Sequence, residues 1–100
     1  MIIPTEMTIG TRKFSIQMLR QMPTKGVMGT VYYNTGAIHL ATHSNTTSGR
    51  YSPSRLQETF WHEITHAVLH DMGSPLFTNE KFVTAFSQRL SKAISSAKFK

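Results

Sequence analysis

One stretch in the second half of the chain decides its fold: residues 52–73, which read SPSRLQETFWHEITHAVLHDMG. Ser52 is a residue type that caps helices, and Pro53 suits the first helical position. Gly73, with Pro75 just beyond it, supplies a stop signal. Apolar residues recur between these ends at helical spacing and define one buried stripe: Leu56, Phe60, Ile64, Ala67 and Val68. A second flank carries Trp61, Leu69 and Met72. We therefore predict a long helix that is mostly enclosed.

The chain before this helix predicts strands. Residues 13–19 alternate apolar and polar side chains, which is typical of a half-buried strand. Residues 31–33 and 37–41 are rich in β-formers and flank Asn34-Thr35-Gly36, whose Asn and Gly suit positive φ. This arrangement predicts a hairpin. Residues 42–52 are rich in Ser, Thr, Asn and Gly and predict a loop.

The chain after the helix predicts a second helix, from Thr78 or Asn79 to about Ala97. Its expected inner face consists of Val83, Phe86, Leu90, Ile94 and Ala97. Strands followed by two helices indicate an α+β fold. No internal repeat or long linker divides the sequence, so we expect residues 1–100 to form a single domain.

His62 and His66 lie four residues apart on the first helix, so their side chains rise from the same face about one turn from each other. Two imidazoles placed in this way can bind one metal ion. Glu63 lies about 100° around the helix from His62, which directs its carboxylate toward a metal-bound water rather than toward the metal. Zinc with three protein ligands lowers the pKa of that water from about 15.7 to about 7, and Glu63 is then placed to act as the general base of a hydrolysis.

The same spacing also occurs by chance on helices whose histidines are merely exposed. Here apolar residues flank the motif on both sides, so the helix has little free surface. Unpaired imidazoles and a carboxylate are costly in such surroundings, which favours the metal interpretation.

A third ligand is required, and Glu80 is the strongest candidate. It precedes Val83 by three residues and so extends the predicted inner face of the second helix, where a carboxylate would point at the core and need a cation. The alternative is a first-turn acid that interacts with the helix dipole. We predict that His62, His66 and Glu80 bind the metal.

Two other residues near the motif, His70 and Asp71, are weaker ligand candidates, and two further histidines receive no role. His70 lies about 12 Å along the helix axis from His62, too far for three histidines of one straight helix to share an ion. Asp71 is expected to be solvated near the helix end. His39 and His43 follow or lie in the second hairpin strand and receive no role.

Composition limits the classes of function. The formal net charge is +6, from eleven Lys and Arg against five acids. This charge favours solubility and permits attraction to nucleic acid or to an acidic partner, but no Lys/Arg run marks a phosphate-binding stripe. Four of the five acids fall within residues 58–80, around the histidines, which suggests a site that needs negative charge.

The sequence contains no cysteine, which excludes disulfides and thiolate zinc sites and fits a reducing compartment. No apolar run approaches the roughly 20 residues of a membrane span, and residues 1–6 lack the features of a secretory signal. We therefore expect a cytoplasmic protein with no membrane partner.

Residues 59–70, TFWHEITHAVLH, resemble the active-site helix of the ImmA/IrrE-type gluzincin metallopeptidases. In that family a strand similar to residues 37–40 precedes the helix across a loop, and a later helix supplies a glutamate. Residues 80–87, EKFVTAFS, match the later motif at Glu80 and Phe86 but carry Val83 and Ser87 where alanines are usual. The similarity covers about residues 37–90, and the small size is similar to that of minimal gluzincins and phage-encoded proteins of this type.

The resemblance implies a zincin-like fold, with a short mixed sheet whose edge strand could hold an extended peptide. It also implies a zinc-dependent peptidase acting on a peptide or protein substrate. Two alternatives stay open. One is a binding module for DNA or a host protein, in which zinc is structural. The other is a hydrolase of non-peptide amides. Glu63 argues against the binding module, since a structural site has no use for a carboxylate beside an open coordination position.

Overall fold

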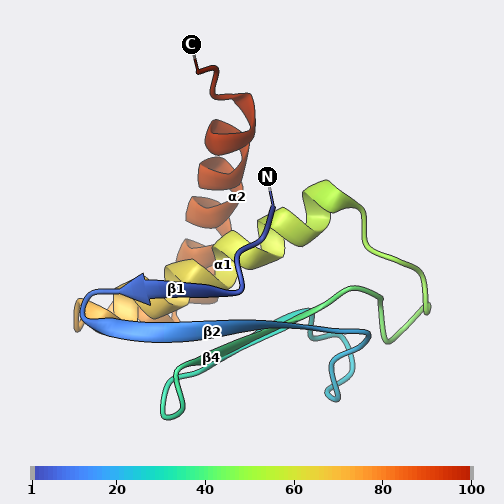
Figure 1. Ribbon diagram of the computed structural model, residues 1–100, viewed down its shortest axis with the longest axis horizontal. Helices are drawn as coiled ribbons and strands as arrows, with labels where there is room; N and C mark the ends of the chain where they lie inside the picture. Colours follow the sequence, from blue (N-terminus) through green and yellow to red (C-terminus); the bar gives the residue numbers. More distant parts are fainter. Residues whose placement is uncertain (1, 100) are drawn as a thin grey trace.

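A computed structural model describes residues 2–99 of the chain and has an α+β fold, in which a four-stranded sheet is followed by two α-helices (Figure 1). The elements are β1 Glu6–Ile9, β2 Arg12–Leu19, β3 Gly29–Tyr32, β4 Ala37–Ala41, α1 Pro53–Asp71, the 3₁₀ turn η1 Pro75–Thr78 and α2 Glu80–Ser96. The predicted fold class and the order of strands before helices are confirmed. Within residues 2–99, neither helix combines the length and the apolar character needed to cross a bilayer.

The sheet has the strand order β1-β2-β4-β3. β2 and β4 are parallel at its centre, and each edge strand is antiparallel to its neighbour. The sequence analysis missed β1, which forms a hairpin with β2 through a turn at Gly10. Gly10 has a φ of 62°, and a Cβ there would overlap the carboxylate of Asp71, so this turn needs glycine.

The predicted hairpin is present and joins β3 to β4. Its turn relies on Gly36, which has a φ of 67° and whose amide donates to the carbonyl of Tyr32. The expectation that Asn34 also takes positive φ is wrong, because one left-handed residue is enough to close a four-residue turn and glycine adopts it without strain. β3 begins at Gly29, two residues before the predicted strand.

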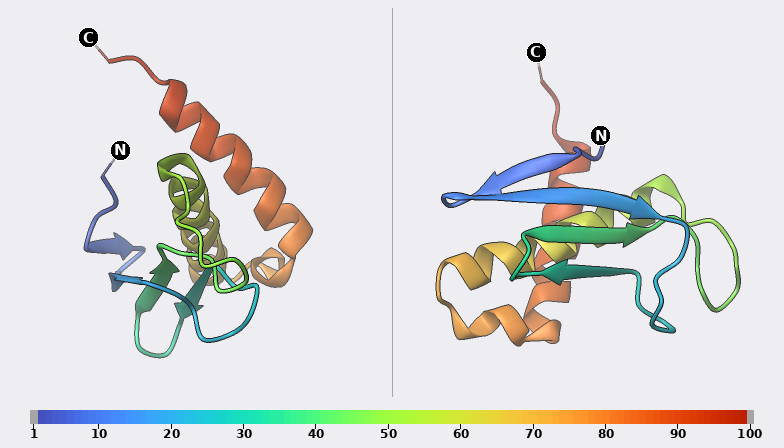
Figure 2. Two further views of the ribbon diagram at one scale, coloured as in Figure 1. Left: turned by 90° about the vertical axis from the view of Figure 1, so that its right-hand side faces the viewer. Right: turned by 60° about the horizontal axis from the view of Figure 1, so that its bottom comes forward.

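α1 packs across one face of the sheet and forms the core with it (Figure 2). The buried side chains that meet there are Ile9, Phe14, Ile16, Ile38, Leu40, Phe60, Ile64 and Ala67. The end of α1 departs from the predicted stripe, since Val68 is 38% and Met72 69% exposed. This end of α1 meets the strand segments through His70 and Asp71 instead, which contact Tyr33 and Gly10.

α2 packs on α1 and η1 rather than on the sheet, and its far end projects from the body of the molecule (Figures 1 and 2). The predicted inner face is only partly correct. Val83 is fully buried, but Phe86 is 48% exposed, and the other buried positions are Ser87 and Ser91. Small side chains at these positions let the two helices approach closely, and a search for apolar residues overlooks them.

Two phenylalanines test this arrangement. Phe60→Ala is expected to lower the free energy of unfolding by about 3–5 kcal/mol, because Phe60 is fully buried between α1 and the sheet. Phe86→Ala removes the same atoms from an exposed position and is expected to cost less than about 1 kcal/mol. Denaturant unfolding of the metal-free proteins measures both values. Equal losses would place Phe86 in the core.

Candidate metal centre

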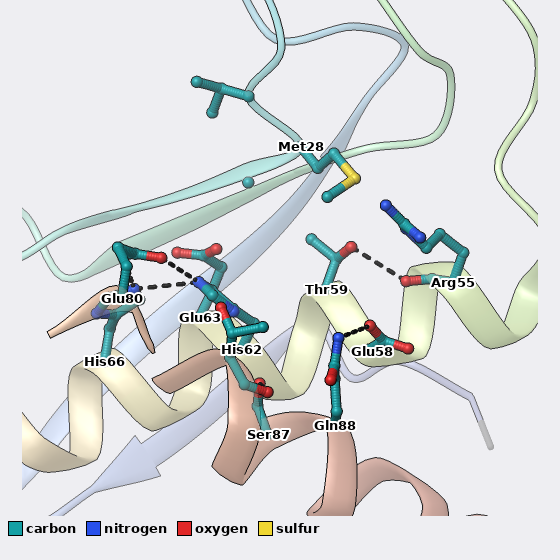
Figure 3. Close-up of a pocket in the computed structure, with 13 residues that line it drawn as sticks. Met28, Arg55, Glu58, Thr59, His62, Glu63, His66, Glu80, Ser87 and Gln88 are labelled. Carbon is teal, nitrogen blue, oxygen red and sulfur yellow. Dashed lines mark hydrogen bonds and ion pairs between the residues drawn. The ribbon is translucent and has the colours of Figure 1, made fainter. Parts of the chain in front are cut away.

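Two segments bring the predicted ligands together. α1 presents His62 and His66 one turn apart on the face that lies beside β3 and the start of α2. The chain then turns through η1, whose first turn is capped by the Ser74 hydroxyl, and enters α2 with the Asn79 side chain capping the amide of Phe82. Glu80 is the first residue of α2 and is thereby placed over the two histidines (Figure 3).

The three side chains converge on one point. Glu80 Oε1 lies 2.7 Å from His66 Nε2, Glu80 Oε2 lies 3.1 Å from His62 Nε2, and the two Nε2 atoms are 3.2 Å apart. Ligand atoms about 2.0–2.1 Å from a tetrahedral zinc lie about 3.3 Å from one another. The spacing of the two Nε2 atoms matches this value, and the two Glu80 contacts, which are made by different oxygens, are shorter. Within residues 2–99 these are the side chains that can hold a metal ion together.

His66 is oriented for this role by the backbone. Its Nδ1 lies 2.6 Å from the carbonyl oxygen of Phe77, to which a protonated Nδ1 donates a hydrogen bond. Donation from Nδ1 leaves Nε2 unprotonated and facing the convergence point. Metal-binding histidines are commonly fixed in this way, and the partner here is supplied by η1.

The surroundings of His62 favour the neutral imidazole, which is the form that binds metals. Burial lowers its pKa, a tendency that the neighbouring Glu80 carboxylate opposes. An imidazole without a proton on Nε2 is the form that coordinates a cation.

Glu63 is buried beside these ligands and lines the same cleft. Burial, with a smaller contribution from the charge of Glu80, raises its pKa to about 8. The charge of Glu80 thus opposes ionisation of the buried Glu63, and a divalent cation held by Glu80 and the histidines would offset this repulsion. The chemistry of the donor set and the position of Glu63 therefore both fit a bound metal.

The expectation that Glu80 points into the core is wrong. Its side chain is 68% exposed, although α2 places it on the same side as the buried Val83. Glu80 opens the helix where the chain emerges from η1, so its outer side faces solvent while its oxygens reach back to His62 and His66. It lies at the rim of the cleft.

The weaker candidates lie outside the centre. The ring of His70 stacks on Tyr33 with centroids 4.2 Å apart and meets Phe77 edge-on. Asp71 lies against Gly10 in the β1–β2 turn. Neither side chain belongs to the converging group.

The two histidines left without a role also have other neighbours. His39 on β4 packs edge-on against Tyr32. The Nδ1 of His43 lies 2.7 Å from the hydroxyl of Thr42. Desolvation and then the charges of Arg20 and Arg50 lower the pKa of His43.

A cleft of about 470 Å³ opens over the centre between β3, α1 and the start of α2 (Figure 3). A second hollow of about 330 Å³ continues from it along β3 toward η1, and both are lined by Glu63, His66, Glu80 and Gly29. The centre thus sits partway along a groove that follows the edge strand.

Sequence reasoning missed two residues that shape this groove. A Cβ on Gly29 would lie 3.1 Å from Cγ of Glu63 and 3.1 Å from Cγ2 of Thr59, so glycine lets β3 pass directly over α1. Tyr33 lines the second hollow, and burial followed by the charges of Glu63 and Glu80 raises the pKa of its hydroxyl, which therefore stays a hydrogen-bond donor. The only signal for Gly29 was a glycine at the start of a β-rich run.

Comparisons of the chain with protein-family models, with curated proteins and with solved structures find no match.

Proposed function

We propose that this protein is a zinc-dependent metallopeptidase of the gluzincin type, with His62, His66 and Glu80 as metal ligands and Glu63 as general base. The observation that carries the proposal is the convergence of three ligand atoms with a buried fourth side chain, Glu63, beside them in an open cleft. A structural zinc site usually has four protein ligands and is closed, whereas three ligands facing a cleft suit catalysis.

Zinc is the metal we propose, although two imidazoles and a carboxylate also suit iron(II). Glu63 supports zinc, because a carboxylate that accepts a proton serves hydrolysis and has no necessary part in an oxygenase. When bound, zinc supplies a Lewis acid that polarises a carbonyl oxygen and makes water acidic enough to lose a proton near neutral pH.

Three residues of the groove have further roles in the proposed reaction. Glu63 takes the proton of the attacking water and delivers it to the leaving nitrogen, as a general base and then a general acid. Gly29 holds β3 close above Glu63 and narrows the space in which the carboxylate can move. The protonated hydroxyl of Tyr33 is a donor on the η1 side of the groove.

The edge strand offers a place for an extended substrate. The carbonyls of Met28 and Tyr32 accept hydrogen bonds from the β4 side of the sheet. Backbone groups alternate along an antiparallel strand, so the amides and carbonyls of Gly29 and Val31 point away from β4, toward the open edge. Gly29 and Val31 also line the hollows beside the centre. A peptide pairing with this edge would pass over the ligands, which supports peptides as the substrate class.

The resemblance to ImmA/IrrE-type gluzincins belongs to the same proposal. It is supported by the position of Glu80, which follows the histidine helix on the next α-helix and reaches both histidines. The alternative, a zinc-containing module that binds DNA or a protein without catalysis, predicts the same metal content and no turnover.

Metal analysis is the direct test. We expect the purified protein to bind about one equivalent of zinc per chain, and chelation to lower its melting temperature, since a ligand that binds only the folded state stabilises it. Elemental analysis and calorimetric titration measure the stoichiometry. Digestion of a mixed peptide library by the zinc-loaded protein, read by mass spectrometry, then tests hydrolysis. A chain that stays metal-free after zinc addition would contradict the proposal, and a zinc-loaded chain without turnover would favour the binding module.

A further inference from the structure

Arg55 lines the metal cleft and is exposed there. Its side chain lines the cleft and extends toward Met28 on the opposite wall (Figure 3). Within residues 2–99, no ion pair or side-chain hydrogen bond involves its guanidinium group. The nearest acid along the helix, Glu58, accepts a hydrogen bond from Gln88 on α2 at 3.2 Å. A guanidinium group with five free donors in a cleft is available to bind a carboxylate.

The position of Arg55 relative to the centre suits recognition of a substrate residue. Arg55 precedes His62 by seven residues, which is two turns, so both lie on the same face and are about 10 Å apart along the axis. An extended peptide rises about 3.3 Å per residue. Arg55 is therefore about three residues along a bound peptide from the metal ligands.

The direction of the edge strand indicates which part of the peptide meets Arg55. β3 runs in the same direction as α1, because Gly29 lies over Thr59 and Glu63 while Tyr33 stacks on His70 one turn beyond His66. A peptide that pairs antiparallel with β3, the slightly more stable arrangement, places its C-terminal part over Arg55.

The molecule beyond Arg55 is also positive. Asn45 joins two loops there by bonding the carbonyls of Met22 and Thr24 and the amide of Gly26. These loops carry the cations Arg20, Lys25 and Arg50. No acidic residue occurs between Glu6 and Glu58 in the sequence, and Glu6 faces Lys13 at 3.8 Å. Val27 and Met28, at the end of the first loop, line the cleft, so basic residues that are scattered along the chain lie in loops next to the Arg55 end of the cleft (Figure 3).

We propose that the cleft selects peptides with an acidic residue two or three positions after the bond to be cleaved, and that Arg55 is the residue that selects it. This inference rests on the proposed peptidase function and adds its substrate class. The carboxylate of the substrate pairs with the Arg55 guanidinium, and the loop cations attract further acidic residues in the part of the peptide that extends beyond the cleft.

An acidic peptide fits this surface better than nucleic acid does. Arg55 shares its cleft with Glu58, Glu63 and Glu80, and the charges of Glu58 and Glu80 repel a phosphate backbone that follows the groove. An extended peptide can place one carboxylate at Arg55 and uncharged residues beside the three glutamates. DNA binding is tested as a separate outcome.

The test compares zinc-loaded wild type with Arg55→Ala, Arg55→Glu and the control Arg12→Ala, in which a cation is removed beside Phe14, away from the cleft residues. Each protein digests a library of random-sequence dodecapeptides, and mass spectrometry gives the residue preference at every position after the cleaved bond. We expect about five- to tenfold enrichment of Asp and Glu over Lys and Arg at the second or third position. The enrichment should vanish in Arg55→Ala, turn toward Lys and Arg in Arg55→Glu, and persist in Arg12→Ala. Added salt should weaken it.

A second measurement keeps this inference separate from the proposed hydrolysis. Zinc-loaded Glu63→Gln protein is titrated with acidic, neutral and basic versions of one peptide and with a 20-base-pair DNA duplex, each carrying an uncharged fluorophore. If the acidic peptide binds in an Arg55-dependent way but the wild type cleaves no peptide, selection of acidic residues by Arg55 would be supported and the proposed hydrolysis would be overturned. Turnover without acidic preference would overturn the selection alone. Tighter binding of DNA than of the acidic peptide, or acidic peptide binding that survives Arg55→Ala, would also overturn it.

Discussion

Replacing Glu63 with glutamine is expected to lower kcat of peptide hydrolysis by about 10²–10⁴-fold while the zinc stays bound. The amide preserves the shape of the side chain under Gly29, but it cannot accept a proton from water. Glu63 is also absent from the three ligand atoms that converge, so its loss leaves the donor set complete. Turnover of a cleaved library peptide measures the rate, and elemental analysis of the same sample measures the metal.

Glu58→Gln is the matched control for Glu63→Gln. Glu58 lines the same cleft and has the same side chain, but its carboxylate accepts a hydrogen bond from Gln88 rather than facing the ligands. We expect kcat to change less than about threefold in Glu58→Gln, in line with a removed exposed interaction. Loss of both zinc and activity in Glu63→Gln would make Glu63 a ligand, and unchanged turnover would rule out general-base chemistry at this position.

Removing the Glu80 carboxylate is expected to weaken zinc binding by more than about 100-fold, a larger effect than the loss of a residue that only orients a ligand. Glu80 supplies the third ligand atom beside the nitrogens of His62 and His66, so the alanine mutant has only two protein ligands for the metal. Competitive titration against a chelator of known affinity measures the change. Circular dichroism on the same samples shows whether the mutant is folded.

Two neighbouring residues provide the comparison for Glu80→Ala. Asp71→Ala and His70→Ala remove side chains that also follow the histidine motif but lie against Gly10 and Tyr33. We expect less than about tenfold loss of zinc affinity in either mutant. If Asp71→Ala released the metal while Glu80→Ala retained it, the ligand set would be wrong and the site would belong to another class of zincin.

Much of the centre follows from local sequence because the α-helix fixes it. Two histidines four residues apart must share a face, and Glu63 must lie beside them, whatever the helix packs against. The position of Glu80 was predicted from its helical spacing to Val83, and the packing of α2 on α1 agrees with that spacing. The exposure of Glu80 was not predictable, because it depends on where η1 ends relative to the cleft and so on the position of the first residue of α2.

Local sequence patterns are sufficient to predict the two helices, three of the four strands, the order of elements and the spacing of the histidine pair, since each depends on contacts within a few residues. The three-dimensional packing was needed to show that Ser87 and Ser91 are buried while Phe86 is exposed, that β3 is an edge strand and that Gly29 lies over Glu63. It also decided that Arg55 enters the metal cleft and that Arg20 and Arg50 lie near His43. These features depend on which distant segments pack together. The spacing of apolar residues does not predict such contacts when they are made by glycine, serine or a charged side chain.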